Sequence, residues 1–135
     1  LDARFGDAIA REGVTLSATT VQPGDLLGVT LHWRALATPD ADYTAFVHLL
    51  DAEGVKVAQM DWQPRDAIGP LPTSVWRPGQ AVVSGVVLAL PADLTLGEYR
   101  LIAGMYHWQD GVRLPASGES AAPGDVANVA VIRVE

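Results

Sequence analysis

Residues 27–35 read LGVTLHWRA, and this stretch decides the fold class. Apolar side chains take every second position from Leu27 to Ala35, and the positions between them carry glycine, threonine, histidine and arginine. Successive side chains of a β-strand point to opposite faces, so the alternation predicts a strand with one buried face. A turn sequence, Gln22-Pro23-Gly24-Asp25, precedes this strand, and Thr38-Pro39-Asp40 ends it.

Similar segments recur along the chain between turns that contain glycine or proline. We expect strands over residues 14–18, 43–50, 55–62, 82–90, 99–106 and 126–134. A hairpin return at 112–114 and an edge strand over 5–9 would raise the total to about seven to nine strands. No segment supports a helix longer than one turn. The sequence therefore predicts one all-β domain over residues 1–135, an antiparallel β-sandwich of the immunoglobulin or fibronectin type.

The charge balance excludes several classes of partner. The 135 residues carry 9 Lys plus Arg against 16 Asp plus Glu, a formal net charge of −7. A single lysine, Lys56, and scattered arginines form no basic stripe, which argues against nucleic acid and against anionic membrane surfaces. No apolar run approaches the ~20 residues that cross a bilayer. No signal peptide is visible at the start of the chain. The missing initiator methionine leads us to expect a piece of a longer protein.

The chain has no cysteine, which excludes disulfides, thiolate catalysis and cysteine-ligated zinc. A simple hairpin between residues 27–35 and 43–50 would place His32 opposite His48, and facing histidines could hold a metal ion if a third ligand were present. The alternative, which we expect, is a polar cross-strand pair without metal. Acidic pairs such as Asp40 and Asp42 leave structural calcium open, although no DxDxDG run occurs.

The sequence shows no pattern typical of an enzyme. A GxSxG motif and a glycine-rich phosphate loop are both absent, which argues against a hydrolase triad and a nucleotide cofactor. Asp51, Asp61 and Asp66 are candidates for glycoside hydrolysis only because they are acidic. We therefore expect a domain that is not itself an enzyme and has no cofactor.

The tryptophans are the candidate binding residues. Trp33 lies on the apolar face of its strand and is predicted to be in the core. Trp62 and Trp76 flank the long connection 63–80, and Trp108 lies beside a turn. An exposed aromatic face can stack on the apolar face of a sugar, so Trp62, Trp76 and Trp108 could form a carbohydrate platform. In the alternative arrangement, Trp76 folds back to close the end of the sandwich and Trp62 packs beside it.

Three blocks of sequence carry a family resemblance: YTAFVHLLDAEG at 43–54, PTSVWRPG at 72–79 and GEYRLIAGMY at 97–106. In this order they resemble a β-sandwich domain at the C-terminal end of bacterial multi-pass membrane glycosyltransferases of the family 39 or mannosyltransferase type. The resemblance runs from about Gly13 to Val134. It supplies no catalytic residues for this domain, because the transferase chemistry belongs to the membrane part of those proteins.

The resemblance implies an extracytoplasmic, non-catalytic accessory or interaction domain of a larger cell-envelope protein. Its partners would be a glycan or the parent membrane domain. The alternative function is a carbohydrate-binding module that uses Trp62, Trp76 and Trp108. An exposed edge strand, such as residues 126–134, could also pair with another copy of the chain.

Overall fold

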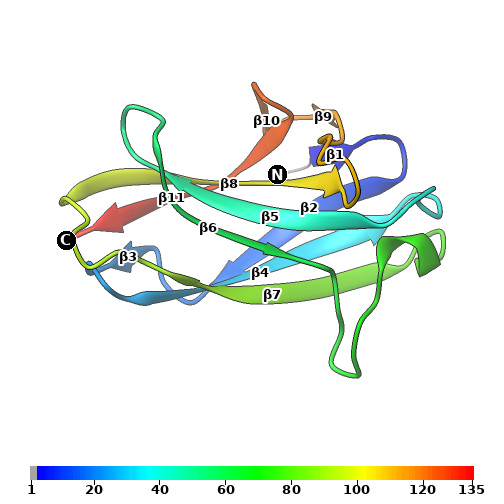
Figure 1. The fold of residues 1–135 in the computed structure, drawn as a ribbon, viewed down its shortest axis with the longest axis horizontal. Helices are drawn as coiled ribbons and strands as arrows, with labels where there is room; N and C mark the ends of the chain where they lie inside the picture. Colours follow the sequence, from blue (N-terminus) through cyan, green and yellow to red (C-terminus); the bar gives the residue numbers. More distant parts are fainter. Residues whose placement is uncertain (1–2) are drawn as a thin grey trace.

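The computed structural model describes residues 3–135, which form two β-sheets packed face to face (Figure 1). Sheet I has the strand order β7-β4-β2-β1-β9, and sheet II has the order β10-β11-β8-β5-β6. The strands are β1 (Ala3–Phe5), β2 (Ile9–Leu16), β3 (Thr20–Val21), β4 (Leu26–Ala35), β5 (Tyr43–Leu50), β6 (Lys56–Trp62), β7 (Ala81–Ala89), β8 (Gly97–His107), β9 (Ala116–Ser117), β10 (Ala121–Ala122) and β11 (Val126–Val134). The prediction of an all-β sandwich is confirmed.

Most long strands follow the predicted ranges closely, but β2 runs from Ile9 to Leu16 instead of over 14–18, because the buried Arg11 and the register shift before Gly13 break the apolar alternation in its first half. The return predicted at 112–114 is not a strand, and Arg113 makes only an isolated bridge to Tyr106.

The other differences lie in the short strands. β1, β3, β9 and β10 have two or three residues each and carry no periodic signal. Residues 5–9 are not one edge strand but the hairpin turn between β1 and β2, where Gly6 adopts a φ of 59° that glycine accepts readily. Phe5 and Ile9 therefore pair across the hairpin, and both point into the core.

The core fills the space between the two sheets. Trp33 is 1% exposed and packs edge-on against Phe5, with 5.7 Å between ring centroids, which confirms the prediction for Trp33. Arg11 is also buried, and its Nη2 donates to Ser120 Oγ at 3.2 Å and to the Asn128 carbonyl oxygen at 3.1 Å. These bonds tie β2 of sheet I to the segment around β11 of sheet II.

The predicted hairpin between β4 and β5 is wrong. β4 pairs with β2 and β7 in sheet I, whereas β5 pairs with β6 and β8 in sheet II, so the connection between them crosses from one sheet to the other. His32 therefore lies between Gly13 and Val83, and its Nε2 is 2.8 Å from Thr15 Oγ1. His48 lies on the other sheet, and the two histidines do not face each other.

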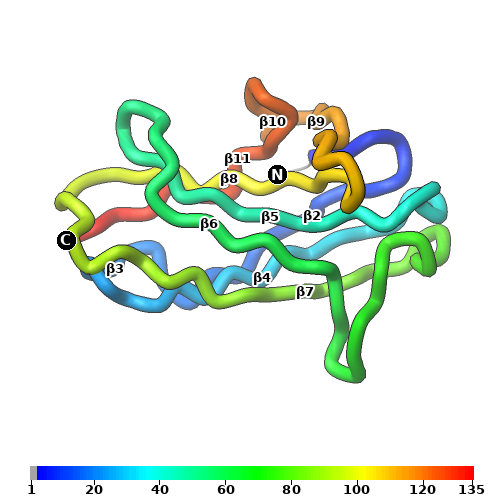
Figure 2. The backbone as a smooth tube through the Cα atoms, viewed as in Figure 1, coloured from blue at the N-terminus to red at the C-terminus, as the bar shows by residue number. Residues whose placement is uncertain are grey.

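The edges of the sandwich differ from expectation as well. β11 is not a free edge, because β10 pairs with its first residues and β3 pairs in parallel with its last ones, on the side opposite β8. The other described strand pairs are antiparallel. β6 and β7 are terminal in their sheets, and the connection between them extends outward from the body of the sandwich (Figure 2).

Helical structure in residues 3–135 is limited to one 3-10 turn, η1 (Thr73–Val75), within that connection. No helix in this part of the chain has the length and hydropathy needed to cross a membrane.

Candidate functional site

Trp76 is fully buried, although it was a candidate for an exposed platform. Its indole Nε1 donates to the Leu71 carbonyl oxygen at 2.9 Å, and its own carbonyl oxygen accepts from Thr38 Oγ1 at 2.7 Å. Trp76 thus presents no ring face to solvent. Its position matches the alternative arrangement, in which it folds back and closes the sandwich.

Trp62 and Trp108 occupy different environments. Trp62 is half-buried, and its Nε1 donates to Ser84 Oγ at 3.0 Å, which joins the edge of sheet II to the edge of sheet I. Trp108 directly follows β8 and is 56% exposed. Of the three candidate tryptophans, therefore, only Trp108 keeps most of its side chain open to solvent.

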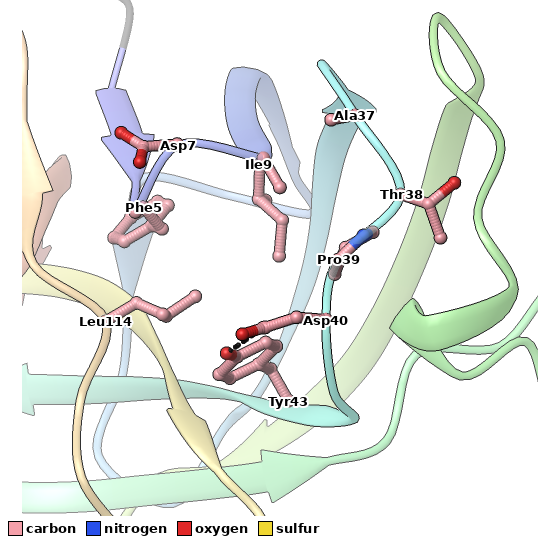
Figure 3. A pocket seen from close by; sticks show the side chains of 11 residues that line it. Phe5, Asp7, Ile9, Ala37, Thr38, Pro39, Asp40, Tyr43 and Leu114 are labelled. Carbon is pink, nitrogen blue, oxygen red and sulfur yellow. Dashed lines mark hydrogen bonds between the residues drawn. The ribbon is translucent and has the colours of Figure 1, made fainter.

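A cavity of about 410 Å³ opens at the loop-rich end of the sandwich (Figure 3). It is surrounded by the turn between β1 and β2, the connection between β4 and β5, the start of β5, and Leu114. Phe5, Ile9 and Pro39 line its apolar inner wall and are buried, and the half-buried Leu114 provides accessible apolar surface. The cavity was missed in the sequence because its walls come from three segments that are far apart along the chain.

One polar pair marks the wall of this end cavity. Tyr43 Oη donates to Asp40 Oδ1 at 2.6 Å, as the dashed line in Figure 3 shows. Burial, followed by the bond to Asp40, raises the pKa of Tyr43 to about 12. The phenol therefore stays protonated at ordinary pH and holds the Asp40 carboxylate in one orientation. Asp40 itself is exposed, and so is Asp7 at the rim.

Buried hydrogen bonds hold the wall of the end cavity in place. Thr73 of η1 is fully buried; its Oγ1 accepts from the Tyr43 amide at 3.0 Å and donates to the Ala41 carbonyl oxygen at 2.7 Å. On the other side, the His107 ring meets the Tyr43 ring edge-on with 5.7 Å between centroids. The cavity wall is thus preorganised by both the long connection and the end of β8.

Trp108 lies beside this wall. It follows His107 in the chain, and its amide donates to the Asp42 carbonyl oxygen at 3.3 Å. Asp42 is next to Tyr43, so the exposed tryptophan belongs to the same end of the sandwich as the cavity. The role of Trp108 in carbohydrate binding stays a prediction.

A second hollow, of about 170 Å³, lies on the outer face of sheet II. The Arg113 guanidinium lies over the Phe46 ring, 4.8 Å from its centroid, and Phe46 is only 1% exposed. Tyr106 Oη donates to Asp61 Oδ2 at 2.8 Å beside it. Burial lowers the pKa of His48, and the positive charges of Lys56 and Arg113 add to this effect. Because the aromatic ring is covered, these contacts serve to hold the segment after β8 against sheet II.

Residues 3–135 contain no group of three or more His, Asp or Glu side chains that could hold a metal ion. The acidic residues bond to nearby groups of the chain, and Asp40 accepts from the Tyr43 hydroxyl as described above. Asp42 Oδ1 accepts from the Ser74 amide, and Asp66 Oδ1 accepts from the Ile68 and Gly69 amides.

The sequence matches no protein-family model and no curated protein. Solved structures are similar in fold. The C-terminal domain of Wzt shares 12% identity at a TM-score of 0.53, over 98% of this chain and 73% of that chain. A Niemann-Pick type C2 protein from the Japanese carpenter ant shares 6% identity at a TM-score of 0.56, over 93% of this chain and 91% of its own. A CARDB domain from Pyrococcus furiosus, solved in complex with di-metal ions, shares 14% identity at a TM-score of 0.50, over 96% and 94%.

These likenesses concern the fold. They agree with the two-sheet, immunoglobulin-like sandwich described above.

Proposed function

We propose that this chain is a non-catalytic binding domain of a larger protein, and that its end cavity holds one sugar residue of a neutral glycan. The observation that carries the proposal is the end cavity itself, with its apolar base and an oriented carboxylate at its wall. Its volume of about 410 Å³ lies within the range of small-molecule sites.

The chemistry of the cavity suits a hydroxyl-rich ligand. A sugar ring has an apolar C–H face, which the half-buried Leu114 would contact, and hydroxyl groups around its edge. The Asp40 carboxylate accepts hydrogen bonds from hydroxyls, and its bond from Tyr43 fixes the direction in which the remaining lone pairs point. Hydrogen bonds to a charged group are among the stronger ones, so Asp40 would contribute much of the selectivity.

The charge around the cavity favours a neutral ligand. Asp7 and Asp40 lie at its opening, and Asp110 is close enough to raise the pKa of Tyr43. The whole chain carries a formal charge of −7. Phosphorylated or uronic acid ligands would meet like charge at this opening, whereas neutral hexoses would not.

Trp108 completes the proposal as an exposed ring beside the cavity, where a second sugar residue of the same glycan would stack. Trp62 and Trp76 are assigned to the packing of the sandwich instead. The resemblance to the C-terminal domain of membrane glycosyltransferases supports a cell-envelope parent and an extracytoplasmic location, and both remain part of the proposal.

The proposal is tested by titrating the ¹⁵N-labelled chain with neutral oligosaccharides of mannose, glucose or galactose, and with uronic acid oligosaccharides for comparison. We expect shifts confined to amides around Thr38, Asp40, Leu114 and Trp108 with a neutral glycan. Asp40→Asn should weaken that binding by about tenfold, because a bond to a charged acceptor is lost. The matched control is Asp93→Asn, an exposed carboxylate outside the end cavity, which should leave the affinity unchanged. Shifts that avoid the cavity, or none at about 10 mM sugar, would contradict the proposal.

A further inference from the structure

β7 forms an open edge of sheet I. It is terminal in the strand order: its backbone pairs with β4 on one side and with no described strand on the other. The end of β6 and the segment after it bond to β7 through the Ser84 side chain, whose Oγ accepts from Trp62 Nε1 and from the Arg65 amide. Its nine residues, Ala81–Ala89, read AVVSGVVLA. The register with β4 runs without interruption from Leu26 opposite Ala89 to Arg34 opposite Ala81, so the edge is straight and has no bulge.

Two hydrogen bonds at the ends of this ladder show which backbone groups of β7 face outward. The Ala35 amide donates to the Gln80 carbonyl oxygen, and the Leu90 amide donates to the Asp25 carbonyl oxygen. In an antiparallel pair, hydrogen-bonded residues alternate with residues whose N–H and C=O point the other way. The even-numbered residues of β7 therefore bond to β4, and the odd-numbered ones direct their N–H and C=O to the open edge.

The outward-facing residues are symmetric about Gly85. In order they are Ala81, Val83, Gly85, Val87 and Ala89, a series that reads the same in both directions. All five are exposed, with Val83 at 51% and Val87 at 53%. An interface around a two-fold axis needs a surface that is complementary to itself, and this series meets that requirement.

We propose that β7 pairs antiparallel with β7 of a second copy of this chain, with the two-fold axis at Gly85. Val83 then lies opposite the partner's Val87, and Ala81 lies opposite the partner's Ala89. Two hydrogen bonds for each outward pair give roughly ten between the chains. The two copies of sheet I join into one continuous sheet, and the valine side chains pack against each other across the new strand pair.

The other edges of the sandwich carry protection that β7 lacks. Natural edge strands avoid pairing by being short, by carrying charge or proline, or by bulging. β6 carries Lys56 and Asp61, and its register with β5 shifts between Leu49 and Leu50. β9 and β10, the other terminal strands, have two residues each. β7 has nine residues with no charge, no proline and no bulge.

Charge favours this strand over the other surfaces as the place where two copies would meet. Two copies with a formal charge of −7 repel each other over most of their surfaces. The segment from Gln80 to Leu90 carries no charged side chain, so the repulsion there is least. Because the remaining repulsion acts between solvent-exposed charges, added salt should screen it and tighten the dimer.

The experiment is sedimentation equilibrium of the chain and of paired variants at exposed valines. We expect Val83→Lys/Val87→Lys to weaken the dimer by roughly tenfold or more, because lysines then face each other in both cross-strand pairs. Val83→Lys/Val87→Glu alters the same positions but places each lysine opposite a glutamate of the partner, so it should keep the dimer. Val131→Lys, at a valine that is 53% exposed on β11, is the control and should also keep it.

A second measurement needs no variant. The amides of Val83, Gly85 and Val87 should exchange hydrogen quickly at low protein concentration and slowly at high concentration, whereas those of Val82 and Ser84 should be protected at both. A chain that stays monomeric up to about 1 mM overturns the proposal. An equal loss of dimer in both double variants overturns the register, and a loss in Val131→Lys places the contact elsewhere.

Discussion

Replacing Gly104 with alanine should destabilise the protein through a clash on the outer face of sheet II. A Cβ atom at Gly104 would lie 2.5 Å from Phe46 Cζ and 2.8 Å from Phe46 Cε2, closer than non-bonded carbon atoms come. The Phe46 ring has little room to move, because Arg113 lies over it and Tyr106 is 6.0 Å away between ring centroids. Extra atoms in such a packed place typically cost about 1–3 kcal/mol, so Gly104→Ala should lower the free energy of unfolding by that amount.

Urea unfolding followed by far-ultraviolet circular dichroism measures this loss. The matched control is Gly69→Ala, the same chemical change at a glycine whose added Cβ would have no heavy atom within 4 Å. That variant should be neutral or stabilise by up to about 1 kcal/mol, because alanine restricts the unfolded chain.

A double variant separates the clash from a general effect of the substitution. Phe46→Leu removes the far end of the ring, so the combined variant Phe46→Leu/Gly104→Ala should be more stable than the sum of the single effects predicts. The reasoning is refuted if Gly104→Ala is within about 0.5 kcal/mol of the unaltered chain, or if the two effects simply add.

Three further outcomes follow from the structure. Trp76→Ala should lower the free energy of unfolding by about 3–5 kcal/mol, because the side chain is fully buried. Trp108→Ala, at the exposed tryptophan, should change it by less than about 0.5 kcal/mol. Equal effects of the two variants in chemical denaturation would contradict the positions assigned to these side chains. Thr73→Val should cost about 1–3 kcal/mol, since it leaves the buried Tyr43 amide without its acceptor, and Ser74→Val, at the exposed neighbour, is the comparison. Burial lowers the pKa of His48 from its ordinary 6.5, so the unfolded chain binds the proton more readily. The contribution of His48 to stability should therefore be full above about pH 6.5 and fall as the pH drops from there towards the folded-state pKa. In urea unfolding, His48→Gln should make the midpoint concentration depend less on pH over that range. An unchanged dependence of the midpoint on pH would argue against a buried neutral histidine.

The period of two in the sequence was enough to predict the long strands and the sandwich. Residues 43–50 are apolar on both parities, which is typical of a strand covered on both faces. β5 pairs with β6 and β8 on its two sides, and Arg113 covers Phe46 on its outer face. The hairpin between β4 and β5 was predicted wrongly because a short connection can turn back within a sheet or cross to the other one. Here β2 and β7 occupy both sides of β4, and β5 has to join the other sheet.

The candidate site was only partly accessible to sequence reasoning. The connection 63–80 was recognised as unusual, but its tryptophan lies inside the protein, where Leu71 accepts its indole hydrogen bond. The end cavity depends on Phe5, Tyr43 and Leu114 meeting in space, and no local pattern connects them. The symmetry of β7 is present in the sequence, yet it acquires meaning only when the strand is known to be an edge.

The parallel pair between β3 and β11 has a consequence for the order in which the chain folds. Thr20 and Val21 lie beside Arg133 and Val134, and the Glu135 amide donates to the Val21 carbonyl oxygen. Contacts between segments so far apart along the chain form slowly, because a long loop must close before they contribute. During synthesis, β8 has to wait for β11 to leave the ribosome before its second edge is covered. Until then β8 pairs with β5 on one side only, and its other, unpaired edge is a place where aggregation can begin while the chain is still folding.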